Sequence, residues 1–126
     1  MKVTLYGIPN CDQVKKARSW LSAHAVEFQF HDFKKAGVTA ELICSWLTHL
    51  ESSSLINRKG TTWRNLPVLE QALVVDDDSA IQCMVKSPSV IKRPVLVVQN
   101  PTQTEIIAGF SEENYRRMFN ISGLPQ

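Results

Sequence analysis

The sequence predicts an α/β protein in which a β-α-β unit and a β-β-α unit build one sheet, with a helical segment inserted between them. Apolar and β-branched runs lie in the first and last thirds of the chain, where turn residues separate them. The middle third shows apolar residues at helical spacing instead. At 126 residues the chain is long enough for one domain with a sizeable core.

The first third predicts strand, helix and strand. Residues 3–7 form an apolar run, and residues 11–24 place apolar side chains every three or four positions. Asn10 is a suitable N-cap for this helix, with Gln13 placed as in a capping box. Residues 26–33 then alternate apolar and polar, so we expect a half-exposed strand and a right-handed parallel crossover.

The middle of the chain predicts helices and no strand. Thr39 can cap a helix over about 40–50, and a shorter helical or irregular stretch follows over about 52–74. The acidic run that begins at Asp76 is typical of another helix start, and Pro88 ends that helix.

The last third predicts two strands and a helix. Residues 94–98 and 104–108 are apolar runs separated by a turn, so we expect an antiparallel hairpin. Ser111 can cap a helix over about 112–119, and we expect the tail after Asn120 to be loose.

This order of elements predicts a thioredoxin-like fold with a mixed four-stranded sheet. We expect a single domain over residues 1–126. Its thioredoxin-like core would comprise residues 1–38 and 89–120, and the helical insertion would cover about 39–88.

Composition excludes several classes of function. The net charge of +2 is too small to indicate a nucleic-acid partner, and no apolar run approaches the roughly 20 residues that span a bilayer. The three cysteines are widely spaced and odd in number, which argues against a disulfide framework and against a zinc site. We therefore expect a cytoplasmic protein with free thiols, no metal and no membrane partner.

Cys11 is the residue most suited to chemistry, because it lies where the first strand turns into the first helix. Free N–H groups and the positive end of the helix dipole lower the pKa of a thiol at this place, and Lys15 follows one turn later. The motif is Cys-x-x-Val, so no second cysteine lies within a turn. The alternative is a small buried residue that fills the corner between strand and helix.

The other cysteines and the histidines predict no site. We expect Cys44 and Cys83 to be structural, since free cysteine is often fully buried. His24, His31 and His49 lack metal-ligand spacing and are expected to be structural or solvated.

Three segments carry a resemblance to a known family: Leu-Tyr-Gly-Ile-Pro-Asn-Cys-Asp (5–12), Leu-Ile-Asn-Arg-Lys-Gly-Thr-Thr-Trp-Arg (55–64) and Ser-Pro-Ser-Val-Ile-Lys-Arg-Pro-Val-Leu (87–96). Over about residues 2–120 the chain resembles the arsenate reductase (ArsC)/Spx-related family, and its motifs are similar to the YffB-type branch. The resemblance implies thiol reduction that depends on glutathione as co-substrate, with no bound cofactor.

The resemblance also implies partners for Cys11. Arg58 and Arg93 match arginines that surround the cysteine and bind an oxyanion, and a guanidinium could also lower the thiol pKa. Pro94 matches a cis-proline that would hold backbone groups beside the cysteine. Asn10 and Lys15, which follow from their positions at the helix start and not from the resemblance, complete the predicted set. The alternatives are surface ion pairs for the arginines and a trans proline that opens a strand.

We expect a monothiol reductase in which Cys11 attacks a disulfide and glutathione, or another small thiol, resolves the product. Arsenate reduction is a first alternative, but the segment Ala108–Ser111 lacks the third arginine of the arsenate reducers. An Spx-like regulator that binds RNA polymerase is a second, but Val14 stands where those regulators carry their second cysteine. A protein thiol is a further possible substrate, and with no exposed apolar stripe expected, the protein should be a monomer.

Overall fold

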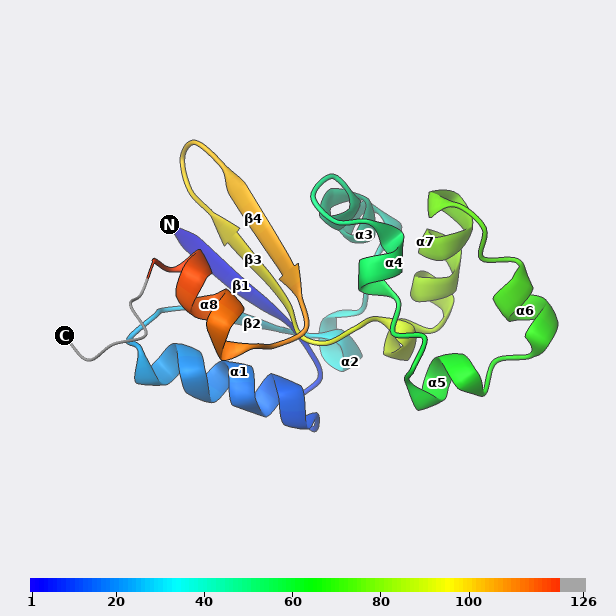
Figure 1. Ribbon diagram of the computed structural model, residues 1–126, viewed down its shortest axis with the longest axis horizontal. Helices are drawn as coiled ribbons and strands as arrows, with labels where there is room; N and C mark the ends of the chain where they lie inside the picture. Colours follow the sequence, from blue (N-terminus) through cyan, green and yellow to red (C-terminus); the bar gives the residue numbers. More distant parts are fainter. Residues whose placement is uncertain (121–126) are drawn as a thin grey trace. The chain divides into compact units, whose positions relative to one another are not determined.

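The computed structural model describes residues 1–120, and the chain forms two compact units (Figure 1). The first unit comprises residues 1–32 and the chain from Arg93 onward, and the second comprises Phe33–Lys92. The second unit thus begins before and ends after the predicted insertion of about 39–88. The expectation of a loose tail after Asn120 lies outside the described residues.

The first unit contains a four-stranded sheet in the order β2-β1-β3-β4. Strand β1 (Lys2–Gly7) pairs in parallel with β2 (Gln29–Asp32) and antiparallel with β3 (Val95–Gln99). Strand β4 (Thr104–Ala108) completes the predicted antiparallel hairpin with β3. The predicted fold class, a mixed four-stranded sheet of the thioredoxin-like type, is therefore confirmed.

The second strand is shorter than the predicted 26–33. Its partner β1 ends at Gly7, opposite Asp32, so the ladder has no neighbour for Phe33, where helix α2 (Phe33–Ala36) begins. The apolar residues Val26 and Phe28 precede the strand but still pack against the core. The alternating pattern therefore extends beyond the hydrogen-bonded residues.

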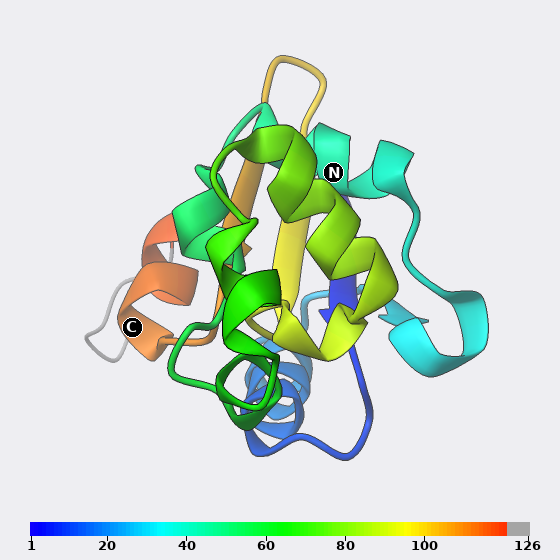
Figure 2. The same cartoon turned by 90° about the vertical axis from the view of Figure 1, so that its right-hand side faces the viewer.

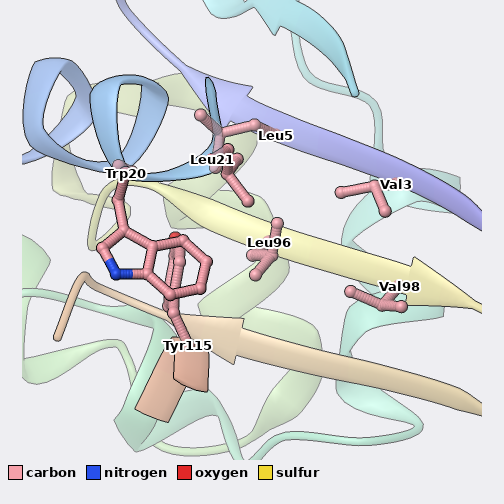
Figure 3. Packing of buried hydrophobic residues seen from close by; sticks show 8 residues of the cluster. Val3, Leu5, Trp20, Leu21, Leu96, Val98 and Tyr115 are labelled. Carbon is pink, nitrogen blue, oxygen red and sulfur yellow. The ribbon is translucent and has the colours of Figure 1, made fainter. Parts of the chain in front are cut away.

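Helices α1 (Asp12–Ala23) and α8 (Glu112–Met118) contribute to the core of this unit. Figure 3 shows side chains from β1, β3 and the two helices converging on Leu96. The ring of Tyr115 on α8 meets the ring of Trp20 on α1 edge-on, with centroids 5.5 Å apart. The predicted cap of α8 is confirmed, because Asn114 N–H donates to Ser111 Oγ at 3.0 Å.

The second unit is built from helices, and Figure 2 turns them towards the viewer. Its two longest are α3 (Ala40–Leu47), which is shorter than the predicted 40–50, and α7 (Asp77–Lys86). The predicted cap at Thr39 is confirmed, because Leu42 N–H donates to Thr39 Oγ1 at 3.1 Å. Helix α7 starts in the acidic run, as predicted, and its N-cap is Asp76, whose Oδ1 accepts from Ser79 N–H at 2.9 Å. Helix α7 packs against α3 and against the short 3₁₀ helix η1 (Pro88–Val90).

The segment predicted as irregular contains three short helices: α4 (Ser52–Leu55), α5 (Thr61–Arg64) and α6 (Val68–Ala72). An isolated antiparallel bridge joins Ile56 to Ile91, and Lys92 N–H donates to Leu55 O at 2.6 Å. These bonds connect the loop after α4 to the residues that lead out of the second unit.

The expectation that no apolar stripe would be exposed is wrong. Large apolar side chains at the end of the chain's middle third are solvent-exposed: Val68, Leu69, Leu73, Val75 and Val85. In α7 the buried residues are Ala80 and Met84, and Val85 is exposed. The expected monomer depended on the absence of such a stripe. Without that support, the monomeric state stays a prediction.

Truncating Leu96 tests the role of this core. Leu96 is fully buried at the centre of the cluster in Figure 3, so Leu96→Ala removes apolar contacts and leaves a cavity. We expect the free energy of unfolding to fall by about 2–5 kcal/mol in chemical denaturation. The exposed Leu69 provides the matched control, and Leu69→Ala should change the free energy of unfolding by less than about 0.5 kcal/mol.

Candidate functional site

The end of β1 and the first turn of α1 lie in close contact. A Cβ atom added to Gly7 would lie only 2.7 Å from Cγ2 of the buried Val14. A side chain at position 7 would therefore push the first turn of α1 away from the sheet. Cys11 lies on the chain between these two residues, so the close approach at Gly7 helps to fix its position.

Cys11 itself is the N-cap of α1, and the prediction that Asn10 caps this helix is wrong. The backbone at Cys11 is extended (φ −143°, ψ 125°), and the helix begins at Asp12. Asn10 is therefore one residue too early, and its side chain is exposed. The Cys11 carbonyl accepts the first intrahelical hydrogen bond, from Lys15 N–H at 2.9 Å.

The pairing of β1 with β3 brings Arg93 towards this turn. Tyr6 on β1 lies opposite Val95 on β3, so the residues just before β3 lie beside the residues just after β1. The Arg93–Pro94 peptide bond is cis, as the resemblance implies. Gly109 N–H, at the end of β4, donates to Pro94 O at 2.8 Å and ties this segment to the hairpin.

Arg93 and the start of α1 make Cys11 more acidic than an ordinary cysteine. Partial burial raises the pKa of the Cys11 thiol, but the Val14 N–H, the Arg93 side chain and the Gln13 N–H lower it by a larger total amount. The Cys11 side chain makes no capping hydrogen bond with α1, all of whose residues belong to the described part of the chain. The N–H groups and the guanidinium act on the thiolate, the form that attacks.

The other predicted partners differ in their placement. Lys15 is exposed one turn along α1 and is not one of the groups that shift the pKa of Cys11. Arg58 belongs to the second unit, where its guanidinium lies 4.7 Å from the ring centroid of Trp63. Its predicted role beside Cys11, like the predicted role of Pro94, stays a prediction.

Sequence reasoning missed the N–H groups of Gln13 and Val14 as specific partners of the thiol. Counted from Asn10 as the cap, they occupy the third and fourth helical positions. Counted from Cys11 they are the second and third, the positions whose N–H groups a capping side chain reaches. The signal in the sequence was therefore the thiol itself, which takes the place that serine or threonine usually occupies.

The other two cysteines have different surroundings. The prediction that Cys44 is a buried structural residue is wrong, because its side chain on α3 is exposed. Cys83 on α7 is half-buried, and burial together with the charge of Glu70 raises the pKa of its thiol. All three thiols are free. Cys83 is therefore less reactive than Cys11 at the same pH.

Neither a metal-binding cluster nor a membrane-spanning helix is found among the described residues. Within residues 1–120, no group of three or more His, Cys, Asp and Glu side chains is placed to hold a metal ion. None of the described helices combines the length and the apolar character that crossing a membrane requires. The described site contains a partly exposed cysteine beside an arginine.

Three comparisons place these features among known proteins. The sequence profile of the ArsC family matches residues 6–118. A solved structure of a YffB protein is 39% identical, with a TM-score of 0.82 over 92% of this chain and 97% of that one. The solved structure of an arsenate reductase (ArsC) related protein from Brucella melitensis is 41% identical, with a TM-score of 0.70 over 96% and 97%. A global transcriptional regulator Spx from Streptococcus pyogenes is 30% identical over 90% of this chain and 82% of its own length.

The opposite pKa shifts of Cys11 and Cys83 predict an order of reactivity that can be measured within one protein sample. With limiting iodoacetamide at neutral pH, Cys11 should be alkylated well before Cys83, because a larger fraction of Cys11 is thiolate. Peptide mass spectrometry of timed samples measures both rates. The ratio of the Cys11 rate to the Cys83 rate should fall as the pH rises and Cys83 also ionises. Equal rates at neutral pH would contradict the lower pKa of Cys11.

Proposed function

Because the chain belongs to the ArsC family, we propose that it is a thiol-dependent reductase whose nucleophile is Cys11. The observation that carries this proposal is the lowered pKa of Cys11, caused by the N–H groups of Gln13 and Val14 and by Arg93. A thiolate that is partly exposed and partly neutralised by a guanidinium is suited to attack on a disulfide. Such chemistry requires a reducing compartment, and we expect the cytoplasm.

The proposed reaction has two thiol–disulfide exchanges. In the first, the Cys11 thiolate attacks a disulfide, forms a mixed disulfide with one sulfur and releases the other as a thiolate. In the second, an external thiolate attacks the mixed disulfide, which regenerates Cys11 and leaves the substrate sulfur joined to the external thiol. Reduction of that product by another external thiol completes the transfer of two electrons from two thiols to one disulfide.

We propose glutathione as the external thiol. The position that would carry a resolving cysteine is Val14, whose side chain is fully buried against the sheet. An intramolecular disulfide at this turn is therefore ruled out by residue type, and the second exchange needs a thiol from outside. The guanidinium of Arg93 could then bind a carboxylate of glutathione as well as stabilise the thiolate.

Neither alternative is favoured by a particular observation. Arsenate reduction would require a third cation after β4, where Gly109 and Phe110 stand instead. The match to Spx includes neither a second cysteine at position 14 nor the full length of that regulator. A control assay for the first alternative is the oxidation of glutathione on addition of arsenate, which we expect not to exceed the rate without protein.

The proposal predicts where glutathione becomes attached. Incubation with oxidised glutathione should produce one glutathione adduct, on Cys11, because the N–H groups of α1 and the Arg93 side chain lower the pKa of this thiol. Peptide mass spectrometry locates the adduct, and reduced glutathione in excess should remove it. An adduct on Cys44 or Cys83 with Cys11 free would contradict the proposal.

Turnover provides a second measurement of the same proposal. Reduction of the mixed disulfide of glutathione and 2-mercaptoethanol, with glutathione as reductant, should be abolished by Cys11→Ser, since serine supplies no thiolate. Cys44→Ser is the matched control and should retain the parent rate, because Cys44 is an exposed residue of the second unit. If Cys11→Ser retained full turnover, Cys11 would not be the nucleophile.

A further inference from the structure

A shallow hollow of about 660 Å³ lies on the first unit, between one face of α1 and the start of α8. Its lining residues on α1 run from Lys15 to the end of the helix, and Phe110 and Glu112 form the opposite side. Its floor is aromatic: Trp20 is buried to 5% exposure, and the ring of His24 stacks on it at a centroid distance of 3.9 Å. Figure 1 shows α8 (orange) and α1 (blue), and the contact between the rings of Trp20 and Tyr115 brings these two helices together.

The hollow begins close to the reactive thiol. Lys15 is one helical turn beyond Cys11, a rise of about 6 Å along the axis. Phe110 follows Gly109, whose N–H is bonded to Pro94, the residue after Arg93. The lining of the hollow is thus connected to the site at two places. One connection runs along α1 from Cys11 to Lys15, and the other runs from Pro94 through Gly109 to Phe110.

The length of the hollow decides between a small and a large occupant. From Lys15 to His24 the helix rises by about 14 Å, which equals about four residues of an extended chain. A substrate whose disulfide lies at the Cys11 sulfur would need to reach about 20 Å from that sulfur to fill the hollow. A polypeptide segment does this, whereas a small disulfide occupies only its near end.

The charge of the hollow selects the kind of segment. Lys15 and Lys16 are both exposed on its α1 side, and the described part of the chain provides neither with an ion-pair partner. Glu112 contributes a single negative charge on the other side. The hollow is thus net positive over an aromatic floor, which complements acidic residues interspersed with apolar ones.

We propose that this hollow, lined by α1 and the start of α8, binds an acidic polypeptide segment that flanks the disulfide attacked by Cys11. The preferred substrate is then a protein whose cysteine is held in a disulfide with glutathione, rather than a small disulfide alone. In the reaction, Cys11 takes the glutathione sulfur, and the protein cysteine leaves as a thiolate. A second glutathione then releases oxidised glutathione and frees Cys11. This inference rests on the proposed function.

The test compares three substrates: a glutathionylated peptide with glutamates on both sides of its cysteine, the same peptide with glutamines, and the mixed disulfide of glutathione and 2-mercaptoethanol. Lys16→Glu should lower kcat/KM for the acidic peptide about fivefold, and Glu112→Gln should raise it about twofold. Neither variant should change the rate with the small disulfide. Added salt should slow the parent protein only with the acidic peptide.

Lys2→Glu is the matched control, because Lys2 is an exposed lysine of the same unit at the opposite end of β1 from the Cys11 turn. It makes the same change of charge and should leave all three rates unchanged. Thermal unfolding should confirm that each variant is folded as the parent is.

Turnover of the small disulfide without any dependence on the charge of the peptide would overturn this inference and leave the proposed function standing. An equal effect of Lys16→Glu on all three substrates would also overturn it, because the hollow would then serve the small thiol. A parent protein that reduces none of the three would contradict the proposed function and, with it, this inference.

Discussion

The interaction on which the site depends is the stabilisation of the Cys11 thiolate by Arg93 and by the N–H groups that begin α1. The thiol and the N–H groups belong to one turn of the chain, Arg93 comes from a distant segment, and the sheet brings the two together. Strand β1 delivers the cysteine at its end, and the antiparallel register of β3 returns Arg93 to the same edge. A shift of that register by one residue would turn the side chains of β3 to the opposite face and separate the two groups.

The helix cap gives the thiol its second constraint. Because the backbone stays extended through Cys11, the side chain faces the free N–H groups that serine or threonine would otherwise satisfy. A neutral thiol is a weak acceptor, so these groups lie near a poor partner until the proton leaves. The geometry at the start of α1 leaves the helix without a strong cap, and it therefore favours the Cys11 thiolate over the neutral thiol. The close approach of Gly7 to Val14 holds this turn against the sheet.

Much of the fold followed from local patterns, because strands and caps depend on neighbouring residues. The caps at Thr39 and Ser111 and the hairpin of β3 and β4 are examples. The errors arose where tertiary structure determines the ends of an element. The length of β2 depends on where β1 ends, and the cap of α1 depends on one extended residue. For the site, Cys11 could be identified from its position and Arg93 from a resemblance, but their interaction depends on a strand register that no local pattern contains.

Arg93 holds the pKa of Cys11 below that of an ordinary cysteine. An ultraviolet titration of the thiolate measures this directly, in a protein with Cys44→Ser and Cys83→Ser so that only one thiol absorbs. We expect a midpoint below the value of about 8.5 for free cysteine, and a higher midpoint when Arg93→Gln is added to the same protein. A midpoint that stays at the free value, or one that does not move when Arg93 is replaced, would show that Arg93 does not stabilise the Cys11 thiolate.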